Sequence, residues 1–111
     1  MSELPRRKMG RTGMQPKALG MGAAFVNHVD EAETIATVER ALELGIDFFD
    51  TYAGANEERW GRALAGVDRA SYYMQAKVGP HPERPKDFSA ETTRWSVEQS
   101  LQALRVDYLD S

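Results

Sequence analysis

Residues 30–50, DEAETIATVERALELGIDFFD, place a helix, a turn and a strand in direct succession. Asp30 is a good helix N-cap, and Glu33 stands three residues later, at the spacing of a capping box. Apolar side chains then recur on one helical face: Ile35, Val38, Ala41 and Leu42. Gly45 stands where a glycine ends a helix, and residues 46–50 come next as a buried strand. The segment therefore predicts a helix that leads straight into a strand.

A hairpin and a first strand are predicted before this segment. Residues 6–22 have the pattern of a short hairpin that leads into a strand at 17–22, which ends in small residues. The turn falls at residues 10–13, GRTG, because its two glycines supply the positive φ that tight turns often need. Pro16 favours an edge or strand-start position for the residues directly after it.

Two further helices and two further strands are predicted after it. A helix begins at the N-cap Asn56 and ends near Gly66, and a strand covers residues 71–78. After a proline-rich loop at 79–87, a helix capped by Ser89 carries an apolar stripe, with Trp95 beside it: Thr93, Val97, Leu101 and Leu104. Residues 106–111 start a fourth strand. Strands that alternate with helices in this way predict right-handed crossovers and a parallel sheet, which is the α/β class.

Composition excludes several classes of protein. The 111 residues carry a net charge of −3 with 41% apolar and 28% charged residues, which is typical of a globular chain without a basic stripe for nucleic acid. There is no cysteine, so disulfides and thiolate metal sites are ruled out. The apolar runs are far shorter than the ~20 residues of a membrane span, and no apolar region of a secretion signal comes after the basic N-terminus. We expect a cytoplasmic protein without a metal site.

Three reactive side chains fall at the carboxyl ends of the predicted strands, where functional groups of parallel sheets gather. Asp50 ends one strand, Lys77 lies near the end of the next, and Tyr52 comes just after Asp50. A tyrosine has an ordinary pKa near ~10, and a neighbouring ammonium lowers the pKa of a tyrosine because it stabilises the phenolate. Such a group is suited to donating a proton to a carbonyl oxygen during reduction, while the hydride must come from a cofactor.

A set of motifs in this order resembles the aldo-keto reductase family along essentially the whole chain. The motifs are MGRTG at 9–13, LGMG at 19–22, ALELGID at 41–47, FDT at 49–51, NEERWGRAL at 56–64, AKVG at 76–79, SL at 100–101 and LRVDYLD at 104–110. The resemblance implies an NADP(H)- or NAD(H)-dependent (β/α)8 TIM barrel that acts on small carbonyl or sugar substrates. Because such a barrel needs ~250 residues, we expect residues 1–111 to be a single partial domain, the N-terminal portion with its leading hairpin, truncated in strand four.

The resemblance also implies roles for individual residues. The family's catalytic tetrad is Asp, Tyr, Lys and His, and by resemblance Asp50 and Lys77 take the aspartate and lysine roles. Gly22 and Ala23 would lie beside the nicotinamide, and Asp50 is counted with them as a cofactor-binding residue.

Two features depart from the family pattern. Its tyrosine usually stands about five residues after the aspartate, where this chain has Ala55, so the shortened loop leaves Tyr52 as the candidate. The family histidine would come after Ser111, and neither His28 nor His81 takes that role, although both belong to loops predicted on the catalytic face.

Plainer interpretations stay open for each residue. Asp50 caps a loop or helix, Lys77 is a solvated lysine, or Tyr52 only packs near the barrel mouth. For the chain as a whole, the alternatives to an enzyme are a cofactor-binding regulatory module of the same family and an inactive fragment. For an isolated fragment we expect an open sheet edge and self-association.

Overall fold

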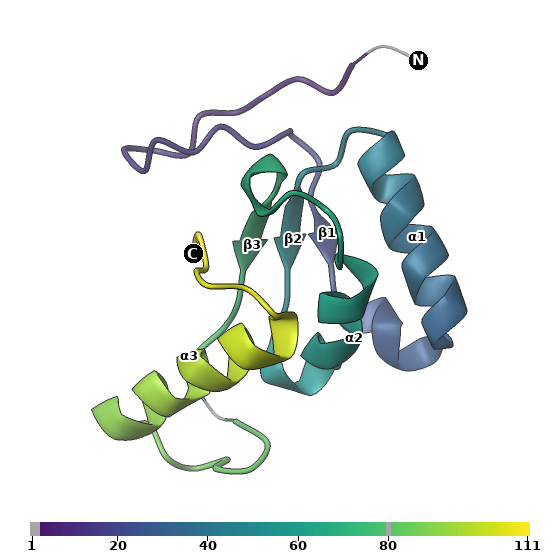
Figure 1. Ribbon diagram of the computed structural model, residues 1–111. Helices are drawn as coiled ribbons and strands as arrows, with labels where there is room; N and C mark the ends of the chain where they lie inside the picture. Colours follow the sequence, from purple (N-terminus) through teal and green to yellow (C-terminus); the bar gives the residue numbers. More distant parts are fainter. Residues whose placement is uncertain (1–2, 80) are drawn as a thin grey trace.

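A three-stranded parallel sheet with helices packed along it forms the centre of the computed structural model, which describes residues 3–79 and 81–111 (Figure 1). The strands lie in the order β1-β2-β3: β1 Met21–Gly22, β2 Phe48–Asp50 and β3 Tyr73–Gln75. The helices are α1 Glu31–Glu43, α2 Glu57–Ala63 and α3 Ala90–Leu104. Three 3₁₀ turns complete the described elements: η1 Ala24–His28, η2 Ala53–Ala55 and η3 Arg69–Ser71. The predicted alternation and parallel sheet are confirmed.

The hydrophobic core lies between the sheet and the helices. Phe49 of β2 and Met74 of β3 are fully buried and adjacent in register, so both side chains leave the sheet on the helix side. Trp60 of α2 is also fully buried, with its ring centroid 5.6 Å from that of Phe49. Because side chains alternate along a strand, the residues next to Phe49 and Met74 project from the opposite face, where the polar residues of the candidate site are found.

The local signals for α1 are confirmed in detail. The Asp30 side chain accepts a hydrogen bond from the Glu33 backbone N–H at 2.8 Å, which satisfies one of the free donors at the helix start. Val38 and Ala41 are buried against the core. Gly45 adopts a φ of 89°, the left-handed conformation that glycine accepts without strain. The helix therefore begins and ends where its sequence predicts.

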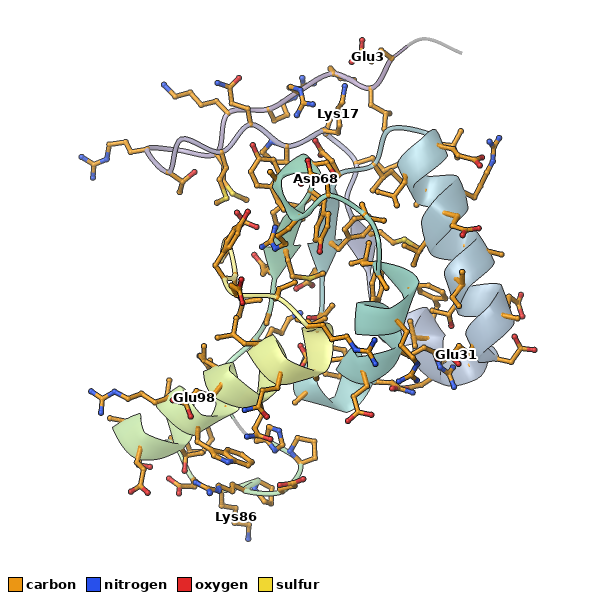
Figure 2. The ribbon with its side chains drawn as sticks, viewed as in Figure 1. Glu3, Lys17, Glu31, Asp68, Lys86 and Glu98 are labelled. Carbon is orange, nitrogen blue, oxygen red and sulfur yellow. The ribbon has the colours of Figure 1, made fainter. Side chains whose placement is uncertain are left out.

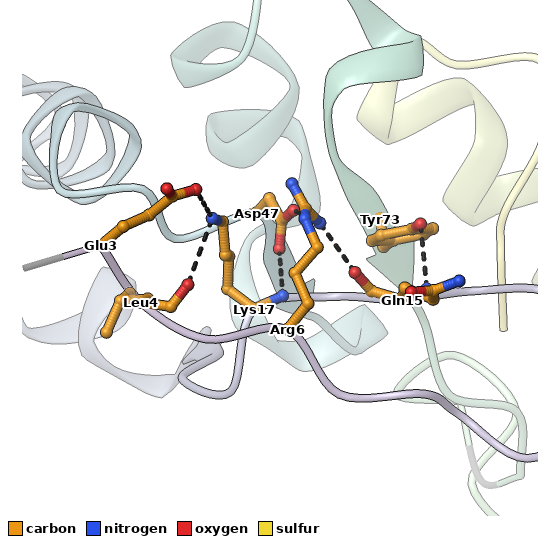
Figure 3. Close-up of polar contacts among 7 residues, drawn as sticks. All are labelled: Glu3, Leu4, Arg6, Gln15, Lys17, Asp47 and Tyr73. Carbon is orange, nitrogen blue, oxygen red and sulfur yellow. Dashed lines mark hydrogen bonds and ion pairs between the residues drawn. The ribbon is translucent and has the colours of Figure 1, made fainter.

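The predicted hairpin forms and covers the amino ends of the strands. Its arms bond to each other through an antiparallel bridge between Arg6 and Lys17. Asp47, just before β2, accepts hydrogen bonds from the Lys17 backbone N–H at 2.8 Å and from the Arg6 guanidinium at 2.9 Å (Figure 3). Lys17 thus belongs to the hairpin, and the strand predicted at 17–22 is confined to Met21–Gly22.

The buried face of α3 differs from the predicted one. Val97 and Leu101 are only half-buried, and the side chains that face the core are mostly small and polar: Thr92, Ser96, Ser100 and Leu104. The reason is a close approach to α2, where a Cβ added to Gly61 would lie 2.4 Å from the carbonyl oxygen of Ala103. Small side chains permit this distance, whereas a stripe of Val and Leu would not. On the outer side of α3, Glu98 is exposed (Figure 2).

The predicted fourth strand is absent as a regular element within the described residues. Residues 106–111 have no strand assignment, yet Asp110 donates a backbone hydrogen bond to Met74 at 2.9 Å and Ser111 accepts one from Ala76 at 3.1 Å. The segment therefore lies along the edge of β3 without a regular ladder. Pro80 of the predicted loop and the first two residues of the basic N-terminus lie outside the described residues. In the part described, no helix is both long and apolar enough to cross a membrane.

Candidate active site

An ion pair joins the carboxyl ends of β2 and β3. The Lys77 ammonium donates to both oxygens of Asp50, at 2.8 Å each. Parallel neighbours end at the same edge of the sheet, which is why two residues separated by one βαβ unit meet here. The Asp50 side chain is 33% exposed and that of Lys77 53%, so the pair is open to a bound molecule. The sequence prediction that these two residues lie together is confirmed.

Tyr52 lies near this pair, with its ring rather than its hydroxyl turned to the ammonium. The Lys77 nitrogen is 5.5 Å from the centre of the Tyr52 ring, within the range of a cation–π contact. Among residues 3–79 and 81–111, no hydrogen bond joins the Tyr52 hydroxyl to Lys77. The short loop explains this geometry, because Tyr52 directly precedes the 3₁₀ turn η2 and its ring packs against Gly54.

Open space lies beside Gly22, at the end of β1. Gly22 is paired in register with Asp50, and a Cβ added to it would meet no heavy atom within 4 Å. Its neighbour Ala23 is 3% exposed and belongs to the hydrophobic core, so its side chain faces away from this space. The position of Gly22 suits the close approach of a flat ring to the backbone next to Asp50. The cofactor-binding roles of Gly22, Ala23 and Asp50 stay predictions.

The sequence prediction missed two residues of this region. Gln75, the last residue of β3, donates from its side-chain amide to Asp50 at 2.9 Å. It stands two residues before Lys77, the spacing at which side chains of an extended chain project to the same side, and this period-2 signal was present in the sequence. Glu57 is 5% exposed and accepts hydrogen bonds from the hydroxyls of Thr51 at 2.9 Å and Ser100 at 2.8 Å. It thereby links the end of β2 to α3.

A mainly apolar cavity of about 370 Å³ adjoins the site, with Tyr52, Lys77 and His81 in its wall. His81 is held in place by the Glu83 backbone N–H, which donates to its Nδ1 at 3.1 Å. Its ring meets Trp95 edge-on at 4.5 Å. Trp95 is therefore half-buried against the loop that precedes α3. Of the two histidines, His81 is the one that shares a cavity wall with Tyr52 and Lys77.

Asp87 links the loop that contains His81 to α3, and this contact can be tested by titration at low pH. The Thr92 hydroxyl, followed by the backbone and side chain of Ser89, lowers the pKa of Asp87 from its ordinary 3.8 to about 2. The pKa of Asp87 is lowered in the folded state. The stabilisation from its contacts is therefore fully present above pH 3.8 and is lost as the pH falls through about 2. We expect the Asp87 carboxyl signal in an NMR titration to move with a midpoint near 2. A midpoint at the ordinary value would contradict the Thr92 contact.

The fold and the site together define a class. Parallel strands that alternate with helices and carry polar groups at their carboxyl ends are the arrangement found in α/β barrels. The model of the aldo/keto reductase family matches residues 18–111. The chain belongs to the aldo/keto reductase family, whose members are oxidoreductases with a barrel fold.

Curated relatives and solved structures agree with this assignment. The chain is 38% identical to L-galactose dehydrogenase of Arabidopsis thaliana over 99% of its own length and 37% of that protein. It is 33% identical to D-arabinose 1-dehydrogenase of Saccharomyces cerevisiae, over 83% of the chain and 31% of that protein. A putative aldo-keto reductase from Pseudomonas aeruginosa superposes with a TM-score of 0.83 and 35% identity, covering 94% of this chain and 44% of that one. The chain thus spans less than half the length of these relatives.

Proposed function

We propose that residues 1–111 supply the first βα units, and with them the Asp50–Lys77 part of the active site, of an NAD(P)H-dependent oxidoreductase that interconverts aldehydes or ketones and alcohols. A sugar hydroxyl or lactol is the substrate class that we favour within this range. The observation that carries the proposal is the Asp50–Lys77 pair, half-exposed at the strand ends beside Tyr52. The sugar preference rests on relatives whose names include L-galactose dehydrogenase and D-arabinose 1-dehydrogenase.

The residues present fit a nicotinamide cofactor. A flat ring would find room beside Gly22, where even a Cβ meets nothing within 4 Å. The donor set next to that space is an ammonium paired with a carboxylate, which is suited to orienting polar groups and to supporting proton transfer. When bound, the cofactor supplies or accepts the hydride that no side chain can provide. One relative carries NADP(+) in its name and another is named as NADH-specific, so both forms of the cofactor stay open.

Each side chain has a defined task in the proposed reaction. Tyr52 donates its hydroxyl proton to the carbonyl oxygen during reduction and takes it back during oxidation. Lys77 stabilises the phenolate that remains, because its positive charge lies close to the ring. Asp50 accepts hydrogen bonds from Lys77 with both oxygens and so fixes the direction of the ammonium. In this scheme the Tyr52 ring turns so that its hydroxyl meets the substrate.

The proposal is tested by monitoring the absorbance of NADPH and NADH in the whole protein with a panel of small aldehydes, ketones and sugars. Saturable, cofactor-dependent turnover is expected with at least one of them. Cofactor binding without turnover across the panel would reject the enzymatic function.

Gly22→Val gives a matched test of the cofactor position. The new side chain fills the space beside Asp50, so we expect the dissociation constant for the cofactor to rise about tenfold or more, a loss of ~1.4 kcal/mol. The melting temperature should change little, because a Cβ at this position has no heavy atom of the described residues within 4 Å. Cofactor fluorescence measures binding, and Gly22→Ala serves as the smaller control. Unchanged affinity in Gly22→Val would place the nicotinamide elsewhere.

One observation favours a second function, that of a cofactor-binding regulatory module. The loop between Asp50 and Asn56 is short, and it holds the ring face of Tyr52, not its hydroxyl, towards Lys77. A protein with this arrangement would bind NAD(P)H and turn over slowly or not at all. Tyr52→Phe separates the two functions: it abolishes turnover in an enzyme that uses the hydroxyl, and it leaves cofactor binding intact in both cases.

A further inference from the structure

Asp50 receives a second donor besides Lys77, and this donor is Gln75, the last residue of β3. The side-chain amide of Gln75 donates to Oδ1 at 2.9 Å, the oxygen that also accepts from Lys77 at 2.8 Å. Gln75 and Asp50 are direct partners in the parallel register of β2 and β3. The Gln75 backbone carbonyl in turn accepts the Thr51 N–H at 2.8 Å. Gln75 therefore holds β2 by its backbone and the Asp50 carboxylate by its side chain.

Lys77 alone is poorly suited to holding the Asp50 side chain in one rotamer. Its side chain is long, has many rotamers and is 53% exposed, so ordering it costs conformational entropy. Gln75 is half-buried at the end of a strand, and its amide approaches Asp50 from a neighbouring backbone position. An amide held in this way keeps the Asp50 side chain in the rotamer whose carboxylate the ammonium then meets.

We propose that Gln75 is a positioning residue of the active site, which fixes the Asp50 carboxylate in the orientation that receives Lys77. The role rests on the function proposed above, because it assigns a purpose to the geometry of the Asp50–Lys77 pair. Gln75 acts through Asp50 and is not assigned a contact with the substrate.

The first experiment measures the orientation of Asp50 in the whole protein and needs no turnover. Three-bond NMR couplings across the Cα–Cβ bond of Asp50 report whether its side chain occupies one rotamer. We expect a single rotamer in the wild type and averaged couplings in Gln75→Met, whose unbranched side chain matches glutamine in size but has no donor. Gln102→Met, an exposed change on α3, is the control and should keep the single rotamer. A single Asp50 rotamer in Gln75→Met overturns the proposal.

The second experiment measures kinetics in the whole protein. Gln75→Met is expected to lower kcat about 10- to 100-fold, because a misoriented catalytic group slows the chemical step. The KM for the cofactor should change less than about twofold. Gln75→Glu adds a negative charge beside Asp50, so it should also move the pH–rate profile to higher pH, since nearby protons are then held more tightly. A loss of stability alone would lower the apparent kcat through the fraction of folded enzyme, but it would leave the pH–rate profile unchanged, so the shift of that profile is the result that identifies the positioning role.

The outcomes separate this inference from the proposed function. Wild-type turnover with an unchanged kcat in Gln75→Met rejects the positioning role and keeps the enzyme. Absence of turnover in the wild type rejects the enzyme, and the rotamer measurement still decides whether Gln75 orients Asp50.

Discussion

Replacing Lys77 by methionine is expected to lower kcat for carbonyl reduction by about 10²- to 10⁴-fold, the range that a positioned proton-transfer system contributes. The ammonium is the only positive group that the structure places on Asp50 within residues 3–79 and 81–111, and it lies 5.5 Å from the Tyr52 ring. Methionine keeps the length of the side chain but removes the charge. The Tyr52 phenolate then loses its stabilisation, and Asp50 loses its partner.

Lys86→Met is the matched control for this experiment, because Lys86 is exposed on the loop before α3 (Figure 2). The control should keep wild-type kcat and KM. The dissociation constant for the cofactor in Lys77→Met, measured by fluorescence, shows whether the variant has lost the chemical step or cofactor binding. A kcat within threefold of the wild type would show that the pair is an ordinary surface ion pair, which is worth at most ~1 kcal/mol.

Gly61→Ala is expected to lower the free energy of unfolding by about 3 kcal/mol or more, although alanine is normally the better helix former by ~1 kcal/mol. The added Cβ would lie 2.4 Å from the Ala103 carbonyl oxygen and 3.1 Å from the backbone of Leu104. These are main-chain atoms of α3, which cannot turn aside as a side chain can. The clash therefore outweighs the gain in helix propensity.

Urea denaturation of Gly61→Ala and Gly22→Ala side by side checks this prediction. Gly22 is the control because the added Cβ meets nothing within 4 Å there. Since small domains are stable by only ~5–15 kcal/mol, a loss of this size is a large fraction of the total. A neutral or stabilising Gly61→Ala would mean that α2 and α3 lie farther apart in solution than in the structure.

Local signals in the sequence were sufficient for the starts of the helices. Asp30, Asn56 and Ser89 each accept a hydrogen bond from the backbone N–H three residues later, as N-caps do. The hydrogen-bond partners of these residues lie within one turn of helix, so no knowledge of the tertiary structure was needed. The pairing of Asp50 with Lys77 also came from a local rule, because residues at the carboxyl ends of adjacent parallel strands meet.

Other features depend on distances between helices and loops, which the periodicity of the sequence does not indicate. The buried face of α3 is set by how closely it approaches Gly61, and at such distances Ser96 and Ser100 are better fillers than Val97. A search for apolar stripes therefore selects the wrong face. The orientation of Tyr52 is likewise decided by the short loop around it, whose conformation depends on the packing of η2.

The polar contacts that fasten the hairpin and the residues of the candidate site lie at opposite ends of the same strands. Asp47 and Tyr73 accept hydrogen bonds from the hairpin at the amino ends, and Asp50 and Gln75 lie at the carboxyl ends. Laboratory evolution of this protein can therefore proceed in two separate libraries. Heat tolerance would be selected by varying residues 6–16, and substrate range by varying the loops after β2 and β3, with little interference between the two.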